Sequence, residues 1–291
     1  MPTPRPVLIL LLLLSAVLAA CAPEAEPGPA AGEAEGPRVV ALSPALGAIV
    51  RDLGRGEVVV GRHAWDRGFP ESVPSVGDQS AIDYERLRRL EPTLVLTQWG
   101  DRALPDRLTT LAAAEGWAVQ NIEMLSLAEI PAGVRAVGAL LGAEREAAEL
   151  VASFERACAP EPGAQRHAGR TLSVYGVSPL GVAGPGSFTH ELIAALGAEP
   201  VPGEGAAFIT MEPEDLRRVD PDTIVFFAPG ADGSAQESML APLRRLRLRA
   251  VEEGRVIFIT DEGALLPSTS VINAADELRA AILRLPEIES D

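Results

Sequence analysis

An internal repeat constrains the fold of this chain more than any other feature. Leu87–Pro92 reads LRRLEP and Leu216–Pro221 reads LRRVDP, and each is followed by a strand with β-branched residues that runs into a glycine-containing loop. Arg38–Leu42 and Arg170–Val174 are similar apolar strands, and each opens one half of the sequence. Fixed-order similarity of this kind indicates copies of one structural unit. The sequence therefore predicts two similar lobes.

Strands alternate with helices in both halves, which favours an α/β fold with parallel sheets. Strands are expected at residues 38–42, 57–61, 93–97, 117–122, 170–174, 223–227 and 255–260. Helices are expected at residues 45–53, 83–90, 105–115, 188–196, 213–219, 240–251 and 270–285, with a Gly/Pro-rich loop at 175–187. Ligands of open parallel sheets bind beyond the carboxyl ends of the strands. We therefore expect the ligand to bind in a cleft between the two lobes.

The stretch Ser126–Cys158 separates the two halves and is the longest helix-patterned segment. Ser126 and Glu129 fit a capping box, and apolar residues then recur at three- and four-residue spacing. Gly138 and Gly142 weaken the middle of this pattern and are expected to mark where the chain leaves the first lobe. The predicted organisation is an N-terminal lobe over 38–130, a single long linking helix over 131–160 with its spacer at 143–158, and a C-terminal lobe over 161–291.

Residues 1–21 have the features of a lipoprotein signal. Val7–Ala20 is apolar but too short to span a bilayer comfortably, because about 20 apolar residues are needed. The run ends in LAAC, which resembles a bacterial lipobox, so Cys21 is the predicted lipidation site. Residues 22–37 are rich in Pro, Ala, Glu and Gly and predict a flexible tether. We expect an exported protein, lipid-anchored in the cell envelope and facing the periplasm or the outer surface.

Composition and missing motifs argue against several functions. A net charge of -16 argues against nucleic acid binding through a basic surface. All 25 basic residues are arginines, which excludes mechanisms that need a lysine, such as a P-loop or a Schiff base. The sequence contains no GxSxG, HExxH or CxxC motif. We therefore expect no enzymatic activity; a hydrolase and a non-transport sensor lipoprotein are the alternative classes.

Six segments, in this order, carry a family resemblance. They are Arg38–Pro44, Val58–Gly61, Val76–Gly77, Leu87–Leu96, Ala136–Gly142 and Gly254–Val256. Through them the sequence resembles the substrate-binding lipoproteins of ABC importers for cobalamin, haem and ferric siderophores, over nearly the whole mature chain. The resemblance implies two lobes on a rigid helix, modest closure on the ligand, and delivery to ABC permease and ATPase subunits. We also expect a monomer.

The resemblance further implies one acidic docking group on each lobe, which meets basic residues of the permease. Carboxylates that follow the paired strands are the candidates. They are Asp101, Asp106, Asp232 and Glu237.

The cobalamin-binding members of the family look closest. Trp99 follows the strand at 93–97, where those members have a tryptophan, and Trp65 stands where they have an aromatic after the second strand. The loop Asp261–Leu266 departs from them because it lacks their aromatic residue. The ligand implied is cobalamin or another metal chelate, with no resident cofactor or metal. The predicted ligand-binding residues are Ser43, Pro44, Trp65, Trp99, Tyr175, Pro179, Phe188 and Glu262.

Other ligands of the same family stay open. Haem needs an axial donor, for which His63 or Tyr84 is a candidate. Ferric siderophores would use Arg62 or Arg102. Zinc would need three or four N, O or S ligands. The histidines available for it are His63, His167 and His190.

Overall fold

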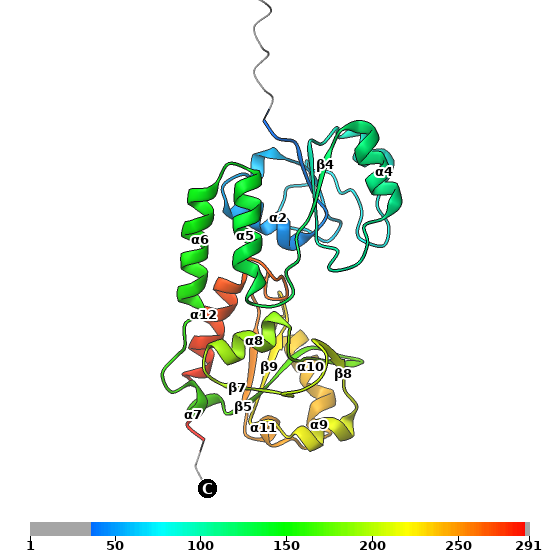
Figure 1. Ribbon diagram of the computed structural model, residues 1–291. Coiled ribbons are helices and arrows are strands. Elements are labelled where there is room, and N and C mark those ends of the chain that lie inside the picture. Colours follow the sequence, from blue (N-terminus) through cyan, green and yellow to red (C-terminus); the bar gives the residue numbers. More distant parts are fainter. Residues whose placement is uncertain (1–35, 289–291) are drawn as a thin grey trace, which may run out of the picture. The chain divides into compact units, whose positions relative to one another are not determined.

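The computed structural model describes residues 36–288, which form two sheets flanked by helices (Figure 1). The predicted signal segment, the lipidation site Cys21 and all but the end of the predicted tether lie outside the described residues. Within residues 36–288 no helix is both long enough and apolar enough to cross a membrane.

The first sheet is wholly parallel, with strand order β2-β1-β3-β4. Its strands are β1 (Val39–Ala41), β2 (Val59–Arg62), β3 (Leu94–Thr97) and β4 (Ala118–Asn121). Its helices are α2 (Pro44–Asp52), α3 (Tyr84–Arg89) and α4 (Asp106–Glu115), with a 3-10 turn η1 at Gly56–Val58. Alternate residues of β1 enter two different cores: Val39 packs with α2 residues, whereas Val40 packs with Leu87 of α3 and Leu108 of α4. Helices therefore cover both faces of this sheet.

The second sheet has the path β10-β9-β5-β6-β8, and β7 pairs with β5. Its strands are β5 (Arg170–Val177), β6 (Leu180–Ala183), β7 (Glu199–Val201), β8 (Phe208–Thr210), β9 (Thr223–Phe227) and β10 (Val256–Ile259). The pairs of β5 with β7 and β9, and of β9 with β10, are parallel, as predicted. The loop prediction for 175–187 is wrong, because β5 continues to Val177 and turns into β6 as an antiparallel hairpin. The sheet is therefore mixed.

The helices of the second half also differ in part from the prediction. They are α7 (Ala164–Ala168), α8 (Phe188–Ala195), α9 (Pro213–Val219), α10 (Gly233–Arg244), α11 (Arg249–Glu252) and α12 (Val271–Ile282). The helix expected at 240–251 is two helices. The first begins earlier, because the Asp232 carboxylate accepts a hydrogen bond from Ala235 N (2.9 Å) and caps it. The chain then breaks at Arg247, which has a φ of 52°.

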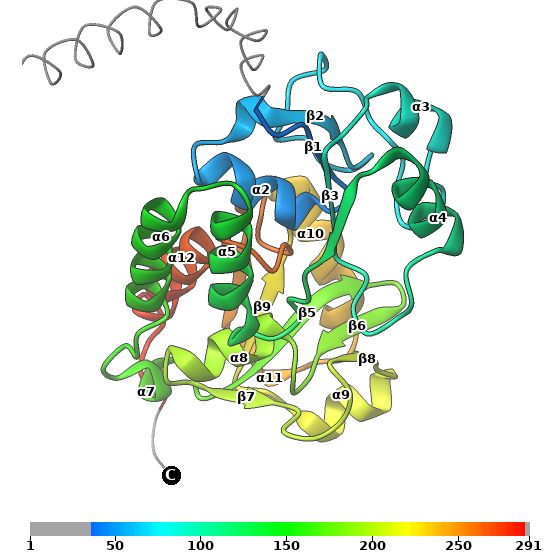
Figure 2. The same ribbon diagram turned by 45° about the horizontal axis from the view of Figure 1, so that its top comes forward.

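The prediction of a single long linking helix over 131–160 is wrong. The central stretch contains two helices, α5 (Glu129–Leu140) and α6 (Glu144–Ala157), which lie side by side in Figure 2. The spacer helix predicted at 143–158 agrees with α6 to within one residue at each end. Gly142 ends the first helix with a φ of 60°. A Cβ on Gly138 would lie 2.5 Å from the Cβ of Ala147, so this glycine permits the close approach of the two helices.

The capping box prediction is correct for one of its two residues. The Glu129 carboxylate accepts hydrogen bonds from Leu125 N (2.7 Å) and Ser126 N (2.9 Å). Ser126 does not cap the helix, because α5 begins at Glu129 and its N-cap residue Ala128 makes no side-chain cap hydrogen bond.

One buried apolar cluster extends through both halves of the chain. It contains residues of β1 and α2, of α5 and α6, and of α8, β9, β10 and α12. Val151 and Phe154 of α6 are among its members, so the spacer helix is part of this shared core.

Candidate functional site

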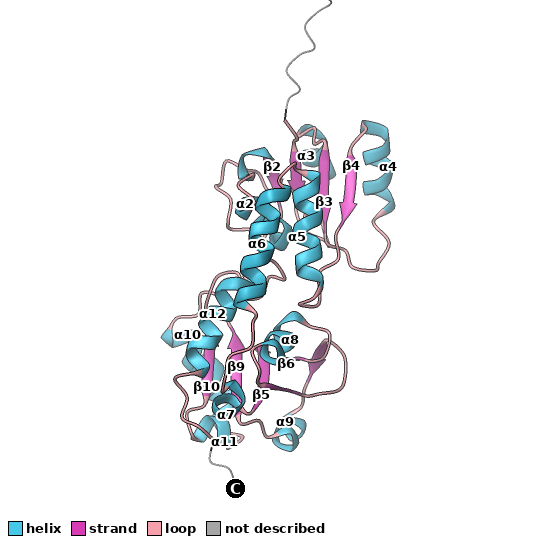
Figure 3. Ribbon diagram, turned by 60° about the vertical axis from the view of Figure 1, so that its left-hand side comes forward, coloured by secondary structure: helices cyan, strands magenta, loops and turns pink. Residues whose placement is uncertain are grey.

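The loops that carry the predicted ligand residues follow strands of both sheets. In Figure 3, β4 of the first sheet and β9 of the second point toward the opposite half of the molecule. Their parallel partners share these directions. The carboxyl ends of the two sheets therefore face each other, as a ligand site between the lobes requires.

Ser43 and Pro44 follow β1 and start α2. The Ser43 hydroxyl accepts a hydrogen bond from Leu46 N (3.4 Å), and Pro44 occupies the first helical position. Ser43 is buried, and its hydroxyl donates to Gln98 Oε1 (2.7 Å), whose amide donates to the Met124 carbonyl (2.8 Å). This chain of hydrogen bonds ties the ends of three parallel strands together.

Trp65, after β2, is the most exposed large apolar side chain among residues 36–288, at 70%. Its backbone N–H donates to Nδ1 of His63 (3.2 Å), and the neighbouring residue Asp66 is buried. An exposed indole on an anchored backbone is suited to contact a planar ligand.

Trp99, after β3, has a different environment and is only 8% exposed. Its backbone N–H donates to Oδ1 of Asn121 (2.7 Å). The Arg102 guanidinium lies 5.7 Å from its ring centroid, and Arg102 Nε donates to the Trp99 carbonyl (3.2 Å). The role of Trp99 in ligand binding stays a prediction, and it requires movement of the side chains that cover the ring.

Tyr175, near the carboxyl end of β5, is 38% exposed. Its ring meets Phe208 of β8 edge to face, with centroids 5.7 Å apart and planes at 87°. Gly181 makes room for the Tyr175 ring, since a Cβ there would overlap it. Phe208 is 57% exposed and was missed from the sequence because its strand was not predicted. Pro179 is exposed in the turn between β5 and β6.

Phe188 and Glu262 complete the predicted set. Phe188 is the first residue of α8 and belongs to the buried core, at 5% exposure. Glu262 is exposed after β10, and a Cβ on Gly230 would lie 2.8 Å from its Oε1. The side chain of Glu262 is therefore accessible to a ligand, whereas that of Phe188 has little surface available for contact.

The four predicted docking carboxylates are all exposed. Asp101 follows β3, and Asp106 is the first residue of α4. Asp232 caps α10, and Glu237 on the same helix pairs with Arg244. Each lobe thus has two candidate acidic contacts.

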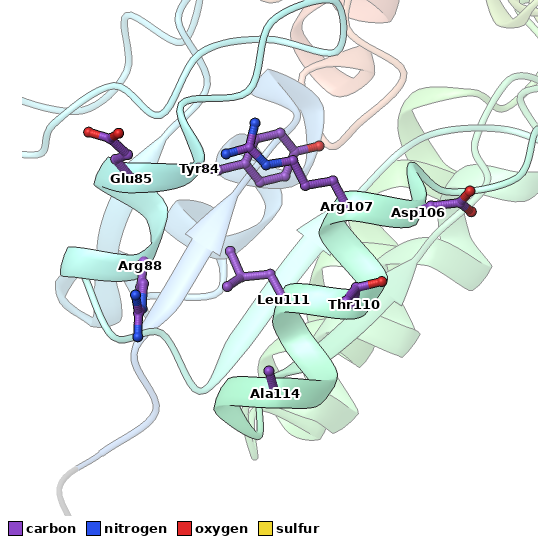
Figure 4. A pocket seen from close by; sticks show the side chains of 8 residues that line it. All are labelled: Tyr84, Glu85, Arg88, Asp106, Arg107, Thr110, Leu111 and Ala114. Atoms are coloured by element: carbon purple, nitrogen blue, oxygen red, sulfur yellow. The ribbon is translucent and has the colours of Figure 1, made fainter.

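A pocket of about 480 Å³ lies between α3 and α4 (Figure 4). Asp106 is at its rim, and the Arg107 guanidinium lies 4.4 Å from the ring centroid of Tyr84. Arg88 pairs with Glu115 (2.7 Å). The Tyr84 ring therefore packs against Arg107 in this pocket, and the role of Tyr84 as an axial donor for haem stays a prediction.

The three histidines lie in separate local hydrogen-bond networks. Burial lowers the pKa of His63, and the carboxylates of Asp78 and Asp66 partly offset this effect. His167 Nδ1 lies 2.7 Å from the Leu285 carbonyl, and His190 Nε2 lies 3.0 Å from the Pro202 carbonyl. Residues 36–288 contain no group of three or more His, Cys, Asp or Glu side chains that could hold a metal ion. These contacts do not favour the zinc alternative.

The arginines considered for siderophore binding make local contacts. Arg62 donates to the carbonyls of Val73 (2.9 Å) and Asp66 (2.9 Å), and to that of His63 (3.4 Å). Arg102 is the more available of the two, because only its Nε is engaged.

Two α/β lobes whose parallel strands end at facing edges are the architecture of a two-lobed solute-binding protein. A family model of periplasmic binding proteins matches residues 39–262, and the chain belongs to this family. No curated protein matches the sequence.

Solved structures share the fold at low sequence identity. The periplasmic haem-binding protein RhuT from Roseiflexus sp. RS-1 is 23% identical, with a TM-score of 0.68 over 85% of this chain and 98% of that one. The vitamin B12-binding protein BtuF of Vibrio cholerae is 16% identical, with a TM-score of 0.68 over 84% and 96%. An Fe3+-hydroxamate transport protein from Saccharomonospora viridis is 20% identical, with a TM-score of 0.64 over 84% and 93%. The predicted fold class, two α/β lobes, is confirmed.

Proposed function

We propose that this protein is the substrate-binding component of an ABC importer and captures a metal chelate, with a corrinoid as the first candidate. The observation that carries the proposal is the family match over residues 39–262. Proteins with the same fold bind vitamin B12, haem and ferric hydroxamates, and these are the ligand classes to test.

Exposed aromatic rings favour a large planar ligand. Trp65 lies at the carboxyl edge of the first sheet, and the pair Tyr175 and Phe208 lies in the second. Aromatic faces supply apolar contact area at low entropic cost, which suits a corrin macrocycle. The exported, lipid-anchored location and the transfer of the ligand to permease and ATPase subunits belong to the same proposal.

Haem is the second candidate, and one observation favours it. The Tyr175 hydroxyl makes no hydrogen bond among the described residues, and the side chain is 38% exposed. A tyrosine oxygen is a known axial ligand of haem iron.

An absorption spectrum of the purified protein, recorded before and after incubation with cyanocobalamin, haemin or ferrichrome, tests these candidates. After removal of free ligand, we expect retained corrinoid absorption. Retained haem absorption that changes in Tyr175→Phe would favour the second candidate. Retention of none of the three would refute the proposed ligand class. Uptake of the retained compound by cells with and without the gene tests the importer role separately.

A further inference from the structure

The segment around Trp65 combines an exposed ring with a fixed backbone. Trp65 N donates to His63 Nδ1 (3.2 Å), and Asp66 N donates to the His63 carbonyl (3.1 Å). Ala64 N donates to the Gly77 carbonyl (2.8 Å). Every residue from Ala64 to Asp66 therefore has its N–H engaged, although the indole itself is 70% exposed.

Asp66 attaches this segment to α2. Its side chain is 2% exposed, and Arg51 Nη1 lies 3.1 Å from Oδ1 and 3.3 Å from Oδ2. Gly68 N also donates to Oδ1 (2.9 Å). The Arg51 guanidinium lies 4.6 Å from the ring centroid of Phe69, which fixes the cation from a second side. Hydrogen bonds between ionised groups are among the stronger ones in proteins.

Two glycines lie so close to this ion pair that a side chain at either position would overlap it. A Cβ on Gly47, in the middle of α2, would overlap Oδ2 of Asp66. A Cβ on Gly68 would overlap the Arg51 guanidinium. The carboxylate and the guanidinium are thus closely confined, and so is the backbone next to Trp65.

We propose that Asp66, through its ion pair with Arg51, is a positioning residue that holds Trp65 in the orientation in which it contacts the ligand. In this ion pair Asp66 is buried and Arg51 is 28% exposed. Such a pair can specify one conformation among several even where it contributes little net stability. The inference rests on the proposed function, since a fixed exposed indole needs a ligand to contact. It assigns to Asp66 and Arg51 a role that does not require either residue to contact the ligand.

The free protein tests the positioning directly. In a Trp99→Phe, Trp117→Phe background, Trp65 is the single tryptophan, and time-resolved fluorescence anisotropy reports its motion. We expect the exposed indole to show a limited fast depolarisation on top of the slow rotation of the whole protein, and Asp66→Ala to increase the fast fraction. Asp66→Asn keeps the shape and an acceptor for Gly68 N, so a smaller effect is expected.

Arg51→Ala should reproduce the effect of Asp66→Ala. The matched control is Arg145→Ala, which removes an exposed ion pair with Glu149 on α6 (2.7 Å) and should change nothing. Circular dichroism identifies any variant that fails to fold, and Asp66→Asn then takes the place of Asp66→Ala. Unchanged Trp65 motion in folded Asp66 variants would overturn the proposal.

Ligand binding provides the second test, with cyanocobalamin, haemin and ferrichrome as probes. For the probe that the unmodified protein binds, we expect Asp66→Ala and Trp65→Ala each to weaken affinity about tenfold. In a Trp65→Ala background, Asp66→Ala should cause no further loss, because it acts through Trp65. Additive losses would contradict the positioning role. Binding of none of the probes would refute the proposed ligand class, and the anisotropy result would still decide the role of Asp66.

Discussion

For Gly47→Ala, helix propensity and the structure predict changes of opposite sign in the free energy of unfolding. Gly47 is buried in the middle of α2. In an exposed helix, replacing glycine by alanine stabilises by about 1 kcal/mol, because alanine loses less backbone entropy on folding. Here the new methyl group would overlap Asp66 Oδ2 and lie 3.1 Å from Phe69 Cε2.

The structure predicts a net loss of stability. Asp66 cannot move away freely, because its carboxylate is bound by Arg51 and by Gly68 N. Disturbing hydrogen bonds to a charged group costs about 1.5–3 kcal/mol, and inserting a methyl group into a filled core costs about 1–3 kcal/mol. Since these costs describe the same displacement, they should not be summed. Against the propensity term of about 1 kcal/mol, we expect net destabilisation by about 0.5–2 kcal/mol.

Urea denaturation followed by circular dichroism measures this difference as a lower midpoint with an unchanged slope. The matched control is Gly233→Ala at the start of α10, where a Cβ would have nothing within 4 Å. The control is expected to be neutral or stabilising. A Gly47→Ala variant as stable as the unmodified protein would refute the packing argument around Asp66.

Three further predictions concern other parts of the molecule. The pKa of Glu129 is lowered by hydrogen bonds from the Leu125 and Ser126 backbone. Its stabilising effect is therefore full above its ordinary pKa of 4.5 and is lost as the pH falls through the lowered value. Glu129→Gln should cost less than about 1 kcal/mol at pH 7, since the side chain is exposed, and nothing in strong acid; a pH-independent loss in urea titrations would contradict this. Reversing Asp101 and Glu237 to arginine should abolish ligand uptake by cells while leaving affinity in calorimetry unchanged; weakened affinity would remove their docking role. Burial raises the pKa of Cys158 to about 11, so iodoacetamide should label it slowly at pH 8 in the folded protein and quickly in urea; equal rates would show that its thiol is not protected.

Features fixed by neighbouring residues were predictable from the sequence. Ser43 and Pro44 carry the start signal of α2 in adjacent positions, and the structure uses both. The spacer helix was recognisable because Gly142 and the apolar spacing after it are local signals. The two copies of the internal repeat, LRRLEP and LRRVDP, likewise begin in α3 and α9, which precede β3 and β9.

Features that depend on distant partners were not predictable. Phe208 lies in a strand of only three residues, which is too short for its pattern to identify it, and this strand pairs with β6. The Trp99 backbone N–H donates to the side chain of Asn121, which lies on another strand, and no residue next to Trp99 in the sequence indicates this contact. In the sequence Asp66 cannot be distinguished from a surface carboxylate. Its burial and its ion pair with Arg51 depend on the packing of α2 against its loop.

The shared core argues against large movements between the lobes. Residues of α2 and α5, of α6, and of α8 and α12 belong to one continuous buried cluster, so separating the two halves would expose apolar surface. Polar contacts join them as well: Phe188 N donates to the Leu125 carbonyl (3.0 Å), and the Glu191 carboxylate accepts from Leu127 N (2.7 Å). Independent motion is the ordinary expectation only where an interface between domains is small or polar. With its core continuous through the spacer helix, this protein is built for local adjustment, such as movement of the side chains that cover Trp99, because opening the lobes would break the core itself.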